Sequence, residues 1–365
     1  MALKCGIVGL PNVGKSTLFN CLSNAKAQSA NFPFCTIEPN VGTINVPDPR
    51  LEKLESLVNP ERVMPTTIEI VDIAGLVKGA SKGEGLGNQF LSNIRETDAI
   101  IHVLRCFDDG NVVHVDGSVD PIRDKEIIDT ELQLKDYETV SKKKSSIERQ
   151  AKTGDKDAKK ALEVYEKVIA TLEANKSARA ADLTEEEELM IRDLQLLTLK
   201  PVLYLCNVDE GSVNTGNEYV EKVKDFVKDE NAQVLVLGAK IEADINELET
   251  YEERQMFLED LGLTEPGVNK LIRSAYELLN LRTYFTAGVK EVRAWTINIG
   301  MKAPQAAGVI HTDFEKGFIR AEVMKYNDFA ELGSESACRD NGKLSVEGKE
   351  YVVEDGDIMH FRFNV

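Results

Sequence analysis

The sequence lacks any long apolar run. No stretch approaches the roughly 18 uncharged apolar residues that a membrane-spanning helix needs. The first residues, MALKCGIVGLPNVGKS, lead directly into an apolar strand and a glycine-rich loop, without the pattern of a signal peptide. With 42% hydrophobic and 29% charged residues, the composition is that of an ordinary globular chain. The sequence therefore predicts a cytoplasmic protein with no membrane partner.

Cysteine and histidine are few and scattered. The six cysteines include no Cys-x-x-Cys pair, and the four histidines are too dispersed for a zinc site. A disulfide framework is not expected in a chain of this size without a secretory signal. Most of the cysteines are therefore expected to be reduced and buried as small apolar side chains.

Positive charge is in deficit. The formal net charge is −18 at pH 7, which argues against broad attraction to nucleic acid and against sequence-specific DNA binding. The deficit is uneven, because residues 282–365 contain 11 Lys and Arg against 13 Asp and Glu, and the preceding 281 residues carry the remaining −16. The C-terminal segment can therefore approach a polyanion more readily than the rest of the chain.

The 365 residues are enough for two or three domains. Short apolar segments predict buried strands that alternate with helical patterns in residues 1–129 and resume in residues 198–281. The segments that predict strands are KCGIVGL, TTIEIVDIAG, AIIHVLRCF, KPVLYLCNVD and AQVLVLGAK. This alternation indicates one α/β domain with a parallel sheet, interrupted by an insertion.

Residues 130–197, which interrupt this domain, are predicted to be helical. Apolar residues recur at helical spacing from Ala158 to Leu172, with Lys and Glu between them. AKTGDKDA divides the region into two antiparallel helices, with Gly154 ending the first and Asp155 available as N-cap of the second. Such a hairpin is either a solvated spacer packed on itself or an arm that binds a partner, and the sequence favours neither.

Residues 282–365 are predicted to form a small β-rich domain. Short alternating segments separated by glycine turns are typical of strands in a compact sheet. The segments that predict these strands are RTYFTAG, VRAWTINIG, GVIHTDF, FIRAEVM and GKEYVVEDGDIMHFRFNV.

The segment GLPNVGKST fits the phosphate-binding pattern G-x-x-x-x-G-K-[ST] from Gly9 to Ser16. It follows a predicted strand and opens a predicted helix, which a chance glycine-rich turn would not combine. Backbone N–H groups would cradle phosphates at the helix N-terminus, where the helix dipole favours anions. The residues of this cradle are Asn12, Val13, Gly14, Lys15, Ser16 and Thr17. Lys15 would place its ammonium on the β- and γ-phosphates, and the Ser16 hydroxyl would bind Mg²⁺.

A second motif, DIAG, ends the strand that begins at TTIEI. Asp72 can hold Mg²⁺ through a water, and the Gly75 N–H can reach a γ-phosphate. Thr36 lies midway between the two motifs and could complete the Mg²⁺ shell, although a proline-rich structural loop would have a similar sequence. The glycine-rich LVKGASKGEGLGNQF after DIAG could order on a triphosphate and relax on hydrolysis. We interpret the two segments as switches.

The segment NVDE, which follows the strand PVLYLC, addresses the choice of base. Guanine-selecting proteins carry Asn-Lys-x-Asp here, whereas this chain has Val208 and Glu210 at the lysine and aspartate places. The longer Glu210 side chain spoils the bidentate distance to guanine. Adenine could instead be read by the Asn207 side chain and by backbone groups near Val208 and Ala239, with Gly238 in the same loop. The motif therefore predicts a preference for ATP, without complete exclusion of GTP.

With these motifs placed, the chain resembles the Obg-like ATPase (YchF) family of P-loop NTPases over essentially its whole length. The resemblance implies a Ras-like G domain, an inserted α-helical coiled-coil hairpin and a C-terminal β-grasp (TGS-like) domain. It also implies a ribosomal partner, expected to be the large subunit, and a preference for ATP. The corresponding domains are residues 1–129 with 198–281, residues 130–197 and residues 282–365.

Leu76 follows DIAG, where many related GTPases carry a water-orienting glutamine. An isobutyl group cannot hydrogen-bond the attacking water, so hydrolysis is expected to be slow. The family resemblance implies that His114 takes this role, although a surface histidine would look the same in the sequence. His102, within an apolar strand, is expected to be a core residue instead.

Two functions fit these features. The first is an ATPase whose slow, Mg²⁺-dependent hydrolysis of ATP to ADP and phosphate moves two switches and signals the bound nucleotide to the ribosome. The second is a nucleotide-sensing, ribosome-binding module whose hydrolysis is incidental.

Overall fold

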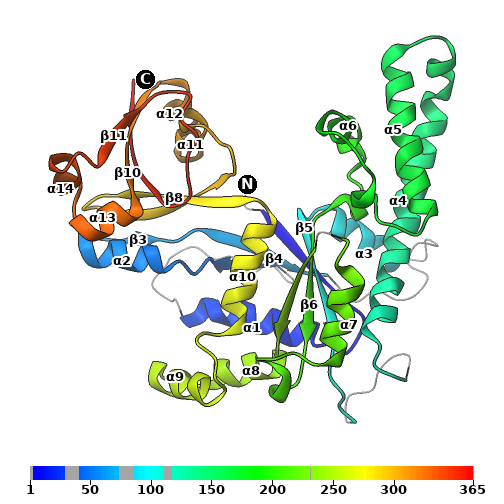
Figure 1. The fold of residues 1–365 in the computed structure, drawn as a ribbon, viewed down its shortest axis with the longest axis horizontal. Coiled ribbons are helices and arrows are strands. Elements are labelled where there is room, and N and C mark those ends of the chain that lie inside the picture. Colours follow the sequence, from blue (N-terminus) through cyan, green and yellow to red (C-terminus); the bar gives the residue numbers. More distant parts are fainter. Residues whose placement is uncertain (1–2, 29–40, 74–85, 111–116, 231, 365) are drawn as a thin grey trace. The chain divides into compact units, whose positions relative to one another are not determined.

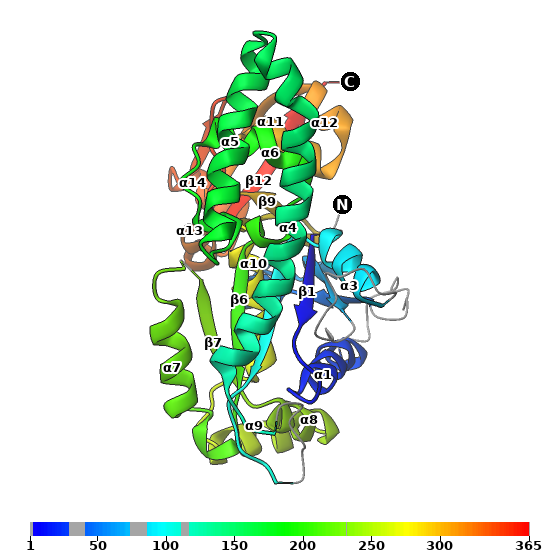
Figure 2. The ribbon, with the colours of Figure 1, turned by 90° about the vertical axis from the view of Figure 1, so that its right-hand side faces the viewer.

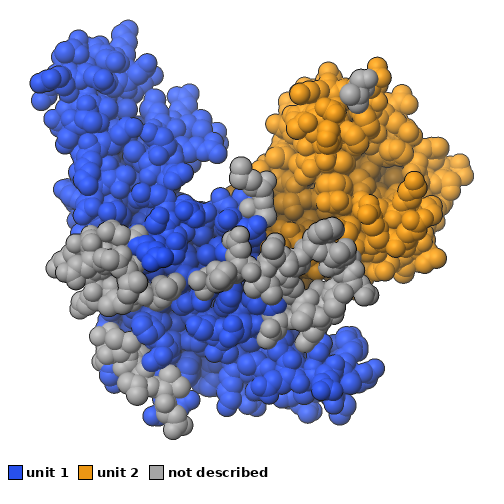
Figure 3. All heavy atoms as spheres, turned by 180° about the vertical axis from the view of Figure 1, so that it is seen from behind, with its two compact units in different colours: residues 1–28, 36–42, 69–271 blue, residues 29–35, 43–68, 272–365 orange. Residues whose placement is uncertain are grey.

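The structure, a computed structural model, describes residues 3–28, 41–73, 86–110, 117–230 and 232–364. The chain divides into two compact units, which Figure 3 shows in different colours. The first unit comprises residues 1–28, 36–42 and 69–271. The second comprises residues 29–35, 43–68 and 272–365.

A six-stranded sheet runs through the first unit in the order β2-β4-β1-β5-β6-β7. Figure 1 labels its strands β4, β5 and β6. Its strands are β1 (Lys4–Val8), β2 (Val41–Asn45), β4 (Thr67–Asp72), β5 (Ala99–Arg105), β6 (Val202–Asn207) and β7 (Gln233–Leu237). Neighbours from β4 to β7 pair in parallel, as the alternating pattern predicts. Every residue of β5 and β6 is buried, which explains the continuous apolar character of both segments.

Helices accompany this sheet. They are α1 (Lys15–Gln28), α3 (Leu86–Arg95), α7 (Glu218–Val227), α8 (Ala239–Glu247), α9 (Tyr251–Asp260) and α10 (Gly267–Leu278). Because the paired strands are parallel, their carboxyl ends share one edge of the sheet. The glycine-rich loop, Asp72, Asn207 and Gly238 all lie at or just beyond those ends.

The helical hairpin consists of α4 (Pro121–Lys152) and α5 (Lys156–Glu173), which lie side by side in Figure 2. The predicted turn is confirmed, since Gly154 has a φ of +100° and the Asp155 carboxylate accepts hydrogen bonds from the first turn of α5. Val140, Val164 and Val168 belong to the apolar core between the helices, which the short helix α6 (Glu185–Ile191) also joins through its last residue.

The start of the hairpin was predicted too late in the chain. Helix α4 begins at Pro121 rather than near residue 130, with Asp120 as its N-cap. The polar residues Asp124, Lys125 and Glu131 are buried in this first part of the helix. They interrupt the apolar periodicity, so the pattern did not indicate a helix there.

Asp136 fastens α4 to the segment that leads into β6. Its carboxylate is fully buried and accepts hydrogen bonds from the N–H groups of Leu197 and Thr198, at 2.8 and 2.7 Å, and from the Thr198 hydroxyl at 2.6 Å. Burial raises the pKa of Asp136, and the three hydrogen bonds oppose that rise. The carboxylate therefore satisfies three buried donors that water does not reach.

Replacement of Asp136 by alanine should lower the free energy of unfolding by about 3 kcal/mol, because three buried donors lose their acceptor. Thermal or urea unfolding of the purified protein measures this loss. Glu138→Ala is the matched control, since Glu138 is a half-exposed acid on the same helix that forms a surface ion pair with Lys135. Equal stability of the two variants would contradict the role assigned to Asp136.

The second unit contains its own six-stranded sheet, in the order β11-β10-β12-β8-β9-β3. Its strands are β3 (Val63–Met64), β8 (Leu281–Ala287), β9 (Val292–Asn298), β10 (Phe318–Lys325), β11 (Leu344–Glu347) and β12 (Asp357–Phe363). Its helices are α2 (Pro49–Val58), α11 (Ala303–Ile310), α12 (Thr312–Lys316), α13 (Tyr326–Leu332) and α14 (Glu335–Asp340).

Alternating side chains of this second sheet enter two apolar cores. Tyr284 of β8 packs with residues of α11, whereas its neighbour Phe285 packs with residues of α2 and α13. Both residues are fully buried. The alternation that predicted strands therefore separates two buried faces rather than one buried face and one solvated face.

Two features of the second unit differ from the sequence prediction. The segment GVIHTDF is helical, not a strand, since α11 begins at Lys302 as N-cap with Pro304 in its first turn and buries Ala306 and Ala307. Residues 43–68 also belong to this unit, because β3 pairs with β9 and α2 enters one of its cores. Nothing in the local sequence of residues 43–68 indicates a partner more than 200 residues away.

No helix in the part of the chain that the structure describes is long and apolar enough to cross a membrane.

Candidate functional site

The glycine-rich loop connects β1 to α1. Asn12 and Gly14 adopt positive φ angles of +64° and +96°. A Cβ at Gly14 would lie 2.3 Å from Nδ2 of Asn207, and a Cβ at Gly9 would lie 2.9 Å from the Val103 carbonyl oxygen. Both glycines of the motif are therefore required by close packing of the loop, independently of any ligand.

Lys15 and Asp72 meet at the end of this loop. The register of the β1–β4 pair places Ile7 opposite Asp72, and the Lys15 ammonium donates to the Asp72 carboxylate. Lys15 is 9% exposed. The structure thus brings together two sequence motifs that lie 57 residues apart. The pair holds the ammonium at the start of α1, where the motif predicts phosphate.

The neighbouring residues suit a magnesium ion. The side chains of Ser16 and Thr17 are exposed in the first turn of α1, next in sequence to Lys15. A serine hydroxyl and an aspartate carboxylate are oxygen donors of the kind that Mg²⁺ prefers. Ser16 and Asp72 therefore fit the ion that the motif predicts.

Asn207, the first residue of NVDE (the base motif), connects this segment to the phosphate loop by hydrogen bonds. Its side-chain Nδ2 donates to the Val13 carbonyl at 2.9 Å, and its Oδ1 accepts from the Ala239 N–H at 2.8 Å. The residue is 4% exposed. Because Asn207 and Val13 are 194 residues apart, no local sequence pattern predicts this brace. Its role in reading adenine stays a prediction.

The other residues of the base motif have different surroundings. Val208 is buried, and its N–H donates to the Leu237 carbonyl at 3.0 Å. Glu210 is exposed at the start of a short 3₁₀ helix, Glu210–Ser212. Gly238 is the N-cap of α8, and Ala239 is its first residue. The segment thus places one exposed carboxylate beside a buried, hydrogen-bonded loop.

Four residues of the sequence analysis lie outside the described part of the structure. They are Thr36, Gly75, Leu76 and His114. Their roles stay predictions.

His102 is an interior residue, as the sequence predicts. It is 2% exposed on β5, and its ring lies 5.7 Å from the Tyr204 ring. Burial, with the nearby charges of Lys125 and Arg179, lowers its pKa to about 3. The imidazole is therefore neutral at physiological pH.

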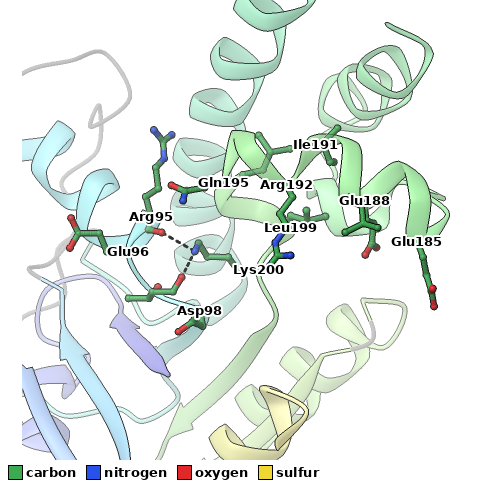
Figure 4. A pocket seen from close by; sticks show the side chains of 13 residues that line it. Arg95, Glu96, Asp98, Glu185, Glu188, Ile191, Arg192, Gln195, Leu199 and Lys200 are labelled. Carbon is green, nitrogen blue, oxygen red and sulfur yellow. Dashed lines mark hydrogen bonds between the residues drawn. The ribbon is translucent and has the colours of Figure 1, made fainter. Parts of the chain in front are cut away.

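A separate cavity of about 740 Å³ lies between the end of α3 and the segment around α6 (Figure 4). The Lys200 ammonium donates to the carbonyls of Arg95 and Thr97 there and so caps α3. The cavity lining also carries Arg192 and the carboxylates Glu96, Asp98, Glu185 and Glu188. The lining has three positive side chains against four carboxylates and includes no residue of the phosphate-binding or NVDE motifs, so the phosphate loop remains the candidate site.

The site combines a strand, a glycine-rich loop that contains lysine and serine, and a helix, and an aspartate ends the adjacent parallel strand. This combination defines a P-loop nucleotide-binding protein. A family model described as a 50S ribosome-binding GTPase matches residues 4–148. A second model, for the C-terminal region of YchF GTPases and described as a protein of unknown function, matches residues 281–364. The chain belongs to the YchF family.

Relatives of known name cover the chain from end to end. The chain is 57% identical to the ribosome-binding ATPase YchF of Haemophilus ducreyi, over 100% of both chains. It is 56% identical to the protein of the same name from Bacillus subtilis, again over 100% of both chains. The solved structure of the Schizosaccharomyces pombe YchF GTPase is 42% identical and superposes with a TM-score of 0.89, covering 99% of this chain and 97% of that one. The family resemblance and the P-loop fold with a C-terminal domain are thereby confirmed.

Proposed function

We propose that this protein is a ribosome-associated ATPase that hydrolyses ATP to ADP and phosphate in a slow, Mg²⁺-dependent switch cycle. The observation that carries the proposal is the ion pair between the buried Lys15 and the partly buried Asp72 at the end of the glycine-rich loop. An ammonium held at a helix N-terminus binds transferring phosphate, and the adjacent carboxylate supports a metal ion. Curated relatives that match the whole chain are named ribosome-binding ATPases.

The loop and the first turn of α1 bind the phosphates of the nucleotide. Backbone N–H groups supply most of the contacts, and Lys15 adds the one positive side chain. The residues proposed to bind nucleotide are Asn12, Val13, Gly14, Lys15, Ser16, Thr17, Gly75, Asn207, Val208, Glu210, Gly238 and Ala239. The Asn207 brace supports this assignment, because it ties the base loop to the phosphate loop.

Ser16, Thr36 and Asp72 are proposed to hold Mg²⁺. When bound, the ion neutralises charge that develops on the phosphate oxygens. Asp72 contacts Lys15 in the structure, so binding of nucleotide and metal would exchange this ion pair for contacts of both residues with the ligand. Lys15 then stabilises the transferring charge.

His114 is proposed to orient the attacking water, because the chain has Leu76 where many related GTPases carry a water-orienting glutamine. Hydrolysis is expected to be slow because the leucine side chain cannot hydrogen-bond water. Slow hydrolysis suits a switch that stays in its triphosphate form until a partner engages it.

We assign a separate role to each domain, with the bounds that the structure gives. The nucleotide-binding part of the first unit hydrolyses ATP, and the hairpin that begins at Pro121 forms the arm. Residues 282–365, in the second unit together with residues 43–68, form a TGS-like domain. The ribosomal partner is proposed to be the large subunit, as the description of the matching family model suggests, and a ribosomal partner supports a cytoplasmic location.

A second candidate is a ribosome-binding module that senses nucleotide without depending on turnover. The absent water-orienting glutamine at Leu76 favours it. The two functions differ in whether the effect of the protein in cells survives loss of hydrolysis.

Removal of Mg²⁺ tests the proposed chemistry. Excess EDTA should lower the rate of phosphate release from ATP by at least about a hundredfold, and added MgCl₂ should restore it. EDTA saturated with Mg²⁺ beforehand is the control for the chelator itself. Unchanged hydrolysis in free EDTA would exclude the magnesium role of Ser16 and Asp72.

A further inference from the structure

The turn of the helical hairpin carries a local excess of positive charge. Residues 149–160, here called the hairpin tip, contain five Lys and Arg but only two Asp. The remainder of the hairpin and its return segment, residues 121–148 and 161–197, contain 10 Lys and Arg against 16 Asp and Glu. The tip is therefore cationic in a chain whose net charge is −18.

The positive side chains of the tip are available to a ligand. All five are exposed, namely Arg149, Lys152, Lys156, Lys159 and Lys160. Among the described residues, their one ion pair joins Lys152 to Glu148, with 3.9 Å between Nζ and Oε2.

The negative side chains of the tip have local structural roles. The Asp155 carboxylate accepts from the N–H groups of Asp157 and Ala158, at 3.0 and 3.1 Å, as the N-cap of α5. Asp157 lies in the first turn of α5, where the helix dipole offsets negative charge. The cations of the tip are consequently left to face solvent.

The tip is held at a distance from the acidic body of the first unit. Helix α4 is anchored at Asp136, and 16 residues of continuous helix separate this anchor from Lys152. At the α-helical rise this is about 24 Å, or roughly three Debye lengths at physiological ionic strength. Screening over that distance reduces a surface potential to about one-twentieth, so the tip acts through its local charge rather than through the net charge of the chain.

The tip is also rigidly presented. Ala151 and Ala158 are buried where the two helices meet near the turn, and Val164 and Val168 continue the packing along α5. Figures 1 and 2 show the turn at the end of the hairpin away from β5 and β6. A partner that reaches the tip therefore meets an ordered, cationic surface.

The composition of the tip distinguishes between classes of partner. No large apolar side chain is exposed within residues 149–160, although such side chains are exposed elsewhere on the described surface. Protein partners generally bind through a buried aromatic or aliphatic anchor, which the tip does not offer. Lysines on flexible stems suit the phosphate backbone of a nucleic acid, which needs positive charge and no base-specific geometry.

We propose that the hairpin tip binds the RNA phosphate backbone and is a ribosomal RNA contact of this protein. The inference rests on the proposed ribosome association, and it resolves the open choice between a spacer and a binding arm in favour of binding. The recognised chemistry is a run of phosphates on structured RNA, independent of base sequence.

The test compares two variants of the full-length protein, each with four exposed lysines replaced by glutamine. The tip variant changes Lys152, Lys156, Lys159 and Lys160. The control variant changes Lys53, Lys222, Lys224 and Lys228. These lysines are exposed outside the tip, and their replacement removes the same total charge. Binding of a fluorescently labelled RNA duplex and co-sedimentation with purified ribosomes are measured at several salt concentrations.

The tip variant should bind the RNA duplex at least tenfold more weakly. The slope of the logarithm of its binding constant against the logarithm of the salt concentration should become less negative by roughly two to three, because phosphate contacts are lost. It should co-sediment correspondingly less with ribosomes. The control variant should stay within about twofold of the starting protein, because its lysines lie outside the tip. Equal losses in both variants, or unchanged affinity and salt slope in the tip variant, would overturn the proposal.

Two further measurements distinguish RNA binding by the tip from binding of an acidic protein and from the proposed ATPase function. Polyglutamate should compete poorly with the RNA duplex, and competition as strong as that of unlabelled RNA would assign the tip to an acidic protein instead. ATP hydrolysis by the tip variant should equal that of the starting protein. If the starting protein binds RNA through its tip but does not hydrolyse ATP, the proposed function fails while the tip assignment stands.

Discussion

Lys15→Ala should lower the rate of ATP hydrolysis by at least about a hundredfold, since it removes the ammonium that pairs with Asp72 at the phosphate loop. The substitution also leaves the Asp72 carboxylate without its partner in the nucleotide-free protein. Hydrolysis is measured as phosphate release under saturating ATP and Mg²⁺, and thermal unfolding checks that the variant is folded.

Lys4→Ala is the matched control for this change. Lys4 is the first residue of β1, and its ammonium forms a half-exposed ion pair with Glu69 at 3.4 Å, away from the loop. Its removal should leave hydrolysis within about twofold, because exposed ion pairs contribute little. A folded Lys15→Ala protein that hydrolyses ATP at the original rate would contradict the assigned role of Lys15.

The same variant separates the two candidate functions. If slow hydrolysis drives the switch cycle, Lys15→Ala should fail to replace the starting protein in cells. If turnover is incidental, the variant should replace it while still associating with ribosomes. Cellular complementation together with ribosome co-sedimentation therefore decides between them.

The second large effect concerns the base. The starting protein should bind ATP at least tenfold more tightly than GTP, and Val208→Lys combined with Glu210→Asp should reverse that order. The shorter carboxylate recovers the distance needed to accept two hydrogen bonds from guanine, and the lysine stem can pack along the base. A tenfold preference corresponds to about 1.4 kcal/mol of base selection.

A second pair of residues, with the same spacing as Val208 and Glu210, provides a control for the double substitution. Val289 and Glu291, in the β8–β9 hairpin of the second unit, can be changed to lysine and aspartate without altering the base segment. Competition titrations in Mg²⁺ should show the original preference for ATP in this control. Tighter binding of GTP by the starting protein would show that Glu210 does not select against guanine.

This measurement also bears on the names of relatives. Curated bacterial relatives are named ATPases, whereas the solved fungal structure is described as a GTPase. The exposed Glu210 and the buried Val208 are the residues by which this chain departs from the guanine motif. We therefore expect the base preference to depend on these two side chains, beside a loop that the fold already holds in place.

Elements formed by neighbouring residues were the most predictable. The glycine-rich loop and the Gly154–Asp155 turn depend on φ angles and hydrogen bonds within a few residues, and the structure contains both. The parallel sheet was also predictable, because β5 and β6 are buried throughout and so are apolar throughout. The first turns of α4 and the helix α11 were missed, because buried charges and a short alanine-rich segment obscure helical periodicity.

By itself, the sequence determined the phosphate loop, the strands of the parallel sheet, the altered base motif and the uneven charge. Each depends on residue type within a short window, where local geometry follows from steric and hydrogen-bonding rules. Only the tertiary structure decided that Asn207 braces Val13, that Lys15 pairs with Asp72, and that β3 extends the second sheet. These contacts join distant residues through the order and register of strands, which no local pattern specifies.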